Sequence, residues 1–141
     1  MTRQCIFLFL ICVAGCQQAP RPETAVTREP ELERLTALRS AAKTQADLNV
    51  ASNALADFWD GKLASIEERI EHVLQKCDGD DQERFLKSKD RWRSHRTEEV
   101  EFVDRWFEGG SIVPLMVNQT YSDITKHRVS ELEFLLNAID H

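Results

Sequence analysis

From Leu48 onward, apolar residues recur at alternating steps of three and four, and this spacing constrains the fold more than any other feature of the chain. Such a period places apolar side chains along one side of an α-helix. The longest stripe consists of Leu48, Ala51, Leu55, Trp59, Leu63, Ile66, Ile70, Val73 and Cys77. After residue 30, no segment of useful length alternates with the period of two that a strand requires. The sequence therefore predicts an all-α fold.

Two further stripes predict two more helices, and a weaker stripe extends the first helix towards its start. The second helix carries Phe85, Trp92, Arg96, Val100, Val103 and Trp106 or Phe107. The third helix begins after Ser111 and Pro114 and carries Val117, Tyr121, Ile124, Arg128, Leu132, Leu135 and Ile139. The weaker stripe consists of Leu32, Leu35, Leu38 and Ala42. The first helix thus begins near Glu31 and either runs long or bends near Asp60-Gly61, and short connections favour an antiparallel bundle of three to four helices.

A tight turn is expected between the first two long helices. Lys76 and Gly79 are typical of a helix end, and Asp80 with Glu83 three residues later is typical of a capping box that opens the next helix. Cys77 falls on the buried stripe, where a cysteine usually behaves as an inert small apolar residue.

Residues 1–15 are typical of a bacterial signal peptide. One charge, Arg3, precedes an apolar run over residues 5–13, which is far shorter than the roughly 20 residues that cross a bilayer. Val13, Ala14 and Gly15 then stand directly before Cys16 and resemble the bacterial lipobox. The sequence predicts cleavage before Cys16 and lipid on its thiol; the alternative is an ordinary secretory signal cut at a nearby small residue.

The residues after Cys16 predict where the protein goes and how it is organised. Gln17 stands where an aspartate would retain an enteric-type lipoprotein at the inner membrane, so the resemblance implies an outer-membrane lipoprotein that faces the periplasm. Two or three acyl chains would make the membrane anchor stable. Residues 16–30 contain three prolines and predict a spacer, and residues 31–141 predict one domain.

Charge and cysteine content restrict the partners of the mature chain. Cleavage removes Arg3, so that 17 of the 18 basic residues remain against 24 acidic ones, a net charge of −7. Such a chain is an unsuitable partner for nucleic acid, whereas a basic protein is a plausible one. With Cys5 and Cys12 removed and Cys16 acylated, Cys77 is the remaining thiol, and no internal disulfide is expected.

The sequence has no motif that indicates catalysis, a metal or a cofactor. It lacks a paired-histidine metal motif, a glycine-rich phosphate loop and a nucleophile beside a recognisable base. The pairs Glu68/His72 and His95/Glu99 have helical spacing, but two ligands do not make a metal site. We therefore expect a protein that is not an enzyme, without metal or cofactor.

Three polar residues fall on the apolar stripes: Arg96, Thr125 and Arg128. A buried guanidinium needs partners to offset its desolvation, so the sequence predicts a structural polar network in which Asp60 or Glu99 is a partner. Arg128 is expected to face the second helix or the turn at residues 109–111 and to pair with a buried carboxylate. The alternative is that these residues contact a partner protein.

These residues also carry a family resemblance, which is strongest over residues 82–136 and extends to Thr44. A tryptophan and an arginine four apart on a helix are followed by a glycine-glycine-serine turn, and then by a threonine three residues before an arginine that precedes a leucine. The set is Trp92, Arg96, Gly109, Gly110, Ser111, Thr125, Arg128 and Leu132. In this order it resembles the domain named after the lysozyme inhibitor LprI, whose members usually carry disulfides where this chain has Val50 or Ala51, Val100 and Tyr121.

The resemblance implies a lipoprotein that binds and inhibits a c-type or related lysozyme, a basic glycosidase whose two catalytic carboxylates lie in a cleft. Another basic envelope protein is the second possible partner. The alternative function, from a different class, is a helical adaptor or scaffold lipoprotein that binds an envelope protein and no lysozyme.

Overall fold

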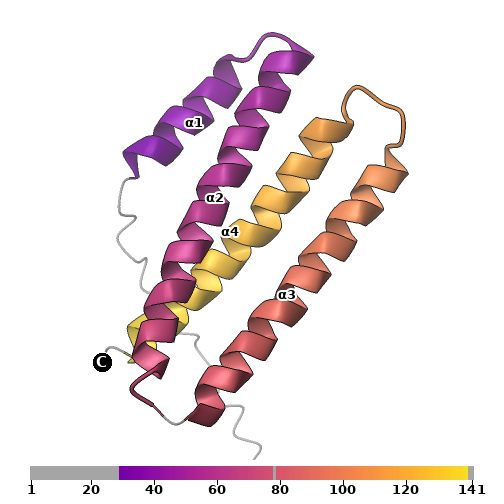
Figure 1. The fold of residues 1–141 in the computed structure, drawn as a ribbon. Coiled ribbons are helices and arrows are strands. Elements are labelled where there is room, and N and C mark those ends of the chain that lie inside the picture. Colours follow the sequence, from indigo (N-terminus) through magenta and orange to yellow (C-terminus); the bar gives the residue numbers. More distant parts are fainter. Residues whose placement is uncertain (1–28, 78, 140–141) are drawn as a thin grey trace, which may run out of the picture.

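The structure is a computed structural model that describes residues 29–77 and 79–139, and in these residues it contains four helices and no strand (Figure 1). The helices are α1 (Pro30–Ala41), α2 (Gln45–Leu74), α3 (Gly79–Trp106) and α4 (Val113–Ile139). Each of the last three helices runs antiparallel to the one before it. The predicted all-α antiparallel bundle is confirmed. None of the helices in these ranges is long and apolar enough to cross a bilayer.

A capping box separates α1 from α2. The Thr44 Oγ1 accepts a hydrogen bond from the Asp47 N–H at 3.1 Å, and the Asp47 carboxylate accepts one from the Thr44 N–H at 3.2 Å. These two bonds satisfy backbone donors that the first turn of a helix leaves unpaired. The chain therefore breaks at residues 42–44, and the expected run or bend near Asp60-Gly61 is wrong, because α2 continues through that point.

The turn between α2 and α3 corrects two predictions. Since α2 ends at Leu74, Cys77 lies in the turn after the helix and is exposed, not buried on the stripe. Its thiol donates to the carbonyl of Val73 at 3.6 Å. The helix α3 already begins at Gly79, so Asp80 lies in the first turn and is not the N-cap. Its carboxylate still stands near the positive end of the helix dipole.

The hydrophobic core lies between α2 and α4. Six aliphatic side chains, each exposing 4% of its surface or less, make up the core: Leu63, Ile66, Ile70, Val129, Leu132 and Leu136. Partly buried side chains surround it, among them Phe85 and Trp92 of α3. The helix α3 itself contributes no fully buried residue. Most of the apolar burial that stabilises the domain therefore joins two of its four helices.

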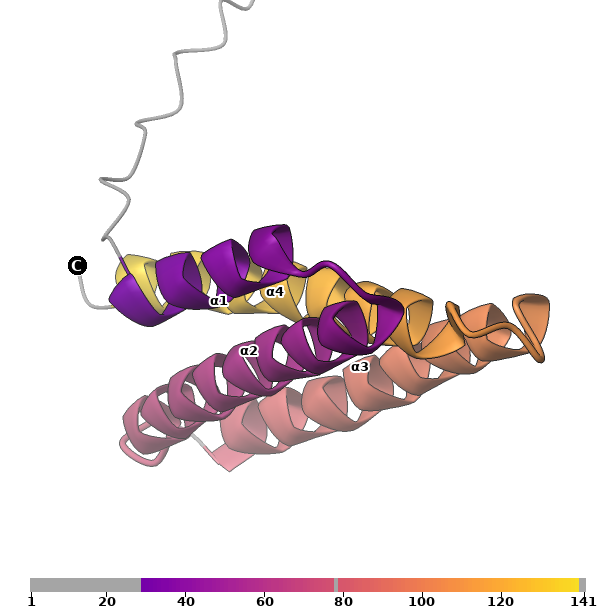
Figure 2. The same cartoon turned by 90° about the horizontal axis from the view of Figure 1, so that it is seen from above.

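The four helices lie in the order α1, α2, α4, α3 (Figure 1). α1 packs against α2 through the buried Leu35, and the Lys62 Nζ lies 2.5 Å from the Glu29 carboxylate beside the start of α1. α4 packs against both α2 and α3, and Figure 2 shows it from above along one side of these two helices. The α1–α2 and α3–α4 connections lie at the same end of the molecule.

Candidate functional site

Arg96 joins three helices through hydrogen bonds. Its Nη1 donates to the Oδ1 of Asp60 on α2 at 2.7 Å and to the Oγ1 of Thr125 on α4 at 3.0 Å. The second oxygen of Asp60 accepts from the Tyr121 hydroxyl at 2.5 Å, and the Thr125 hydroxyl donates to the backbone carbonyl of Tyr121 at 2.7 Å. We call Asp60, Trp92, Arg96, Tyr121 and Thr125 the arginine network.

The guanidinium of Arg96 also lies against two aromatic rings. Its Cζ is 4.1 Å from the ring centroid of Tyr121 and 4.7 Å from that of Trp92. A cation over a ring face is attracted by the ring quadrupole, and more strongly where water is excluded. The Arg96 side chain is 13% exposed, whereas its partner Asp60 is 46% exposed. The predicted polar network is confirmed, with Asp60 as the partner of Arg96, and solvent reaches it from the Asp60 side.

The hydroxyl of Tyr121 is held in its protonated form. Burial of the phenol and its hydrogen bond to Asp60 raise the pKa of Tyr121 to about 12, although the charge of Arg96 acts in the opposite direction. A phenol that keeps its proton can donate to the carboxylate throughout the neutral pH range. The link from α4 to α2 is therefore insensitive to pH near neutrality.

Arg128 faces α3, as predicted, but its carboxylate partner is not buried. Its Nη2 lies 3.2 Å from the Ser88 Oγ, and its Cζ lies 5.9 Å from the ring centroid of Trp92. Its Nη1 donates at 3.2 Å to Glu131, which follows one turn later on the same helix and is 45% exposed. The expectation of a buried carboxylate is wrong because the charge is compensated from the outer side of α4.

A second group of charges joins α2 to α3 and was missed by sequence reasoning. The carboxylate of Glu67, which is 4% exposed, lies 3.1 Å from the Lys89 Nζ and 2.7 Å from the Arg93 Nη2. Lys89 also pairs with Glu71. Burial alone would lower the pKa of Lys89, but the hydrogen bonds to Glu71 and Glu67 raise it above its usual value. We call Glu67, Glu71, Lys89 and Arg93 the ion-pair cluster.

A signal for this cluster is present in the sequence. Lys89 occupies a core position of the α3 stripe, between Phe85 and Trp92, and Glu67 stands next to Ile66 on α2. A lysine at an apolar position predicts a nearby carboxylate, for the same reason that Arg96 predicted either Asp60 or Glu99 as its partner. The partner's identity depends on how the two helices are aligned, which the stripes alone do not fix.

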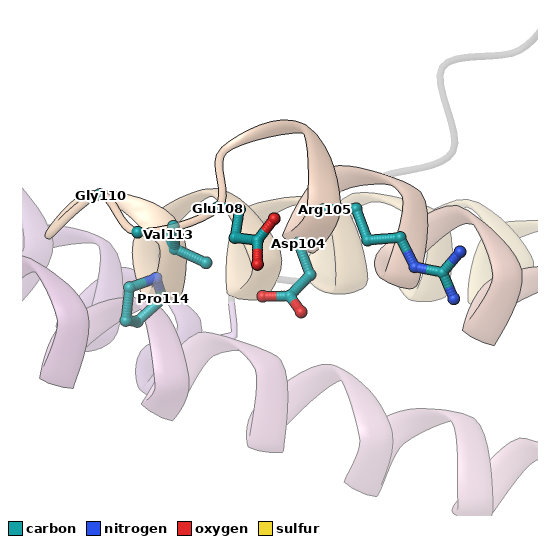
Figure 3. A pocket seen from close by; sticks show the side chains of 7 residues that line it. Asp104, Arg105, Glu108, Gly110, Val113 and Pro114 are labelled. Carbon is teal, nitrogen blue, oxygen red and sulfur yellow. The ribbon is translucent and has the colours of Figure 1, made fainter.

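The glycine-glycine-serine turn lies at the end of the bundle, after α3. Gly109 has a φ of +79°, a backbone conformation that glycine adopts without steric cost. A shallow open hollow beside the turn is lined by Asp104, Arg105, Glu108, Gly109, Gly110, Val113 and Pro114. Figure 3 shows the carboxylates of Asp104 and Glu108 near each other, with the guanidinium of Arg105 pointing away from them. This hollow is acidic and open to solvent.

The eight predicted site residues serve different parts of the fold. Trp92, Arg96 and Thr125 come together in the arginine network, with Arg128 on a further contact of Trp92. Leu132 is 1% exposed and belongs to the core. The remaining three, at residues 109–111, form the turn after α3. The predicted lipidation site, Cys16, lies outside the described residues.

The polar side chains of the arginine network link helices to one another. In residues 29–77 and 79–139, no three His, Cys, Asp or Glu side chains are placed to hold a metal ion. The His95 Nδ1 lies 3.9 Å from the Glu99 carboxylate, and both side chains are exposed. The polar atoms of the arginine network donate to and accept from one another and thereby link α2, α3 and α4.

Comparison with protein families identifies the family of the chain. A family model described as lysozyme inhibitor LprI matches residues 36–132, which contain the arginine network, the ion-pair cluster and the glycine turn. A search of the curated proteins and a search of the solved structures each found no match. The matched span begins within α1 and ends at Leu132 in the core of α4.

Proposed function

Because the chain belongs to the family of the lysozyme inhibitor LprI, we propose that it is an envelope lipoprotein that binds and inhibits a lysozyme-type cell-wall glycosidase. The observation that carries this proposal is the match over residues 36–132, which contains all of α2 and α3 and parts of α1 and α4. In this function the protein is a binding module and not itself an enzyme. Its action on the glycosidase is to occupy or obstruct the enzyme.

The charge of the chain supports a basic enzyme as the target. The mature chain has a net charge of −7, since 17 basic residues remain against 24 acidic ones after loss of Arg3. Opposite net charges steer two proteins together and raise the association rate at low ionic strength. Lysozymes of the c-type are basic, so this acidic domain would attract them.

The N-terminal motif supports a place at the cell envelope. Lipid on Cys16 would anchor the domain to the outer membrane, where it faces the periplasm and the cell wall that the enzyme attacks. Replacing Cys16 by alanine should abolish labelling of the protein with palmitate and release it from the membrane fraction. Labelling that persists in Cys16→Ala would contradict the anchor without touching the inhibitory function.

The inhibitory function is tested by measuring the lysis of bacterial cell walls by a hen-type lysozyme in the presence of the mature chain. We expect lysis to slow in proportion to the inhibitor added, and to stay slow at moderate salt. Charge attraction alone weakens with ionic strength, whereas a complex with matching shapes largely persists. A heat-unfolded sample of the same chain, which has the same charge, is the control. Unchanged lysis at a large molar excess of folded protein would refute the proposal.

The second candidate is a helical adaptor that binds another basic envelope protein. The observation that favours it is that Trp92, Arg96, Thr125 and Leu132 hold the helices together, so the family motif preserves a fold more than a binding surface. A protein that leaves lysozyme fully active yet binds one defined envelope protein would have this function.

A further inference from the structure

The last turns of α3 expose two large aromatic side chains. Phe102 is 60% exposed and Trp106 is 73% exposed. Their ring centroids lie 5.8 Å apart, with the ring planes tilted by 37°. They follow each other at the i, i+4 spacing that places side chains next to each other on a helix. An exposed pair of this size on a small domain is typical of a surface that another protein covers.

The polar contacts of α3 with α2 lie before these two rings along the helix. Lys89 and Arg93 bond to Glu67, and Arg96 bonds to Asp60 one further turn along. After Arg96, the described part of the chain shows no hydrogen bond or ion pair between α2 and α3. Figure 1 shows α3 at the edge of the bundle, with its last turns farther from α2 than its first turns.

The surroundings of the two rings are strongly acidic. Residues 97–108 contain five acidic side chains and one basic one, a net charge of −4. Glu98 and Glu99 precede Phe102 by one helical turn and are exposed, as are the remaining three carboxylates, those of Glu101, Asp104 and Glu108. The one basic residue, Arg105, is partly neutralised by Glu101, whose carboxylate lies 3.8 Å from its guanidinium. We call residues 97–108 the α3 tip.

We propose that the α3 tip is the surface on which the lysozyme docks, with Phe102 and Trp106 as the anchors. This inference rests on the proposed function. Tryptophan is among the residues that most often dominate the energy of protein interfaces, and aromatic rings also attract arginine and lysine side chains. The carboxylates around the rings complement the basic surface of the enzyme.

The charge of the α3 tip also argues against other occupants. A second copy of this chain would bring another net charge of −4 against it. Like charges in an interface are costly, so this end is unsuited to self-association through matching tips. An anionic bilayer would be repelled in the same way. A basic protein is the occupant that both the rings and the charges favour.

The first experiment compares an exposed aromatic residue of the α3 tip with an exposed aromatic residue on α4. Trp106→Ala should weaken binding of the mature chain to hen-type lysozyme by about 30-fold or more, as truncation of an anchor residue does. The matched control is Phe134→Ala on α4, because Phe134 is 74% exposed and lies far along the chain from the α3 tip. It should change the dissociation constant less than about 2-fold. Circular dichroism of both variants checks that the helices remain.

A second experiment removes charge without removing a ring. The double variant Glu98→Gln, Glu99→Gln and the control Glu68→Gln, Glu133→Gln each lose two exposed carboxylates and so change the net charge equally. We expect the first to associate with lysozyme several-fold more slowly than the control at low salt, and the difference to shrink at high salt. Equal association rates would mean that net charge alone steers the enzyme, and not the α3 tip.

The outcomes separate this inference from the proposed function. If wild type inhibits lysozyme and Trp106→Ala inhibits equally well, the docking surface is wrong while the proposed function stands. If wild type neither binds nor inhibits lysozyme, both fail. Loss of inhibition in Trp106→Ala, with Phe134→Ala unchanged and both variants helical, supports the α3 tip as the interface.

Discussion

The two sides of α4 are held in different ways. Towards α2, α4 buries Val129, Leu132 and Leu136 against aliphatic side chains. Towards α3, the polar contacts are those of Arg96 with Thr125 and the ring of Tyr121, and of Arg128 with Ser88 and the ring of Trp92. The α2–α4 interface thus depends mainly on removing apolar surface from water, whereas α3 combines the partial burial of Phe85 and Trp92 with directional polar contacts.

Apolar contacts and hydrogen-bonded charges respond differently to the loss of a partner. Apolar burial is stabilising in any compatible arrangement of side chains, whereas a hydrogen-bonded guanidinium requires each partner in place. We expect α2 and α4 to form the stable centre of the domain and α3 to depend on them. This arrangement leaves the far end of α3 free to carry exposed rings and carboxylates.

The largest expected effect follows from emptying the α2–α4 interface. Leu132→Ala should lower the free energy of unfolding by about 2–5 kcal/mol, because Leu132 is 1% exposed and its loss leaves a cavity. Urea unfolding followed by circular dichroism measures this. The neighbouring Leu135→Ala is the control, since Leu135 is 49% exposed and should cost well under half as much. Equal effects would mean that the core does not lie where we place it.

A smaller effect is expected from removing the charge that holds α3. Arg96→Met should lower the free energy of unfolding by about 2 kcal/mol, which is typical of losing a hydrogen bond to a charged group. It should cost less than breaking a fully buried ion pair, because Asp60 is 46% exposed and can be hydrated once its partner is gone. The control is Arg105→Met, because the Arg105 side chain is 81% exposed and its ion pair with Glu101 is long, at 3.8 Å. Tryptophan fluorescence should report the altered contact at Trp92, and a loss as large as that of Leu132→Ala would contradict the comparison.

Arg128→Met should lower the free energy of unfolding by less again, about 1 kcal/mol or less. Its ion-pair partner Glu131 is 45% exposed, and such pairs contribute little. Its contact with Ser88 is a single hydrogen bond of 3.2 Å. Urea midpoints measure the change, with inhibition of lysozyme measured in parallel. An unchanged midpoint together with lost inhibition would instead place Arg128 in the binding surface.

The sequence predicted the helices because apolar spacing is a local property. The stripes located α2, α3 and α4, and the glycine pair correctly placed the turn before α4. The break before α2 was missed because its capping box closes with Asp47, where glutamate or glutamine is the commoner residue. Cys77 was misplaced because the periodic pattern continues past Leu74 although the helix does not.

The candidate site was predictable where a charge interrupts an apolar stripe. Arg96 had to find a carboxylate, and Asp60 was one of two candidates. The pairing of Lys89 and Arg93 with Glu67 joins residues 22 and 26 positions apart, and it depends on helix alignment. The exposure of Trp106 was likewise outside the reach of the sequence, since the spacing allowed either Trp106 or Phe107 on the inner side. In the structure Phe107 is the half-buried residue of the two.

The smallest effect should appear only in alkali and concerns Tyr121, the one tyrosine of the chain. Its pKa is raised from 10.0 to about 12, by burial first and by the hydrogen bond to Asp60 second. Between these two pH values the unfolded chain has lost the phenolic proton while the folded chain still holds it. The stability that the proton contributes is therefore complete below pH 10 and is lost as the pH rises towards 12.

Tyrosinate absorbance measured against pH tests this directly, because no other tyrosine contributes. We expect the titration midpoint of the folded protein well above 10, and a lower midpoint in Asp60→Asn that still exceeds the value of a free phenol, since burial is the larger cause. A midpoint near 10 in wild type would show that solvent reaches the hydroxyl and that the arginine network is open. Leu135→Ala should leave the titration unchanged, because it alters an exposed aliphatic side chain and not the polar contacts between α2 and α4. Tyr121 thus gives a readout of the polar contacts that is separate from the stability of the core.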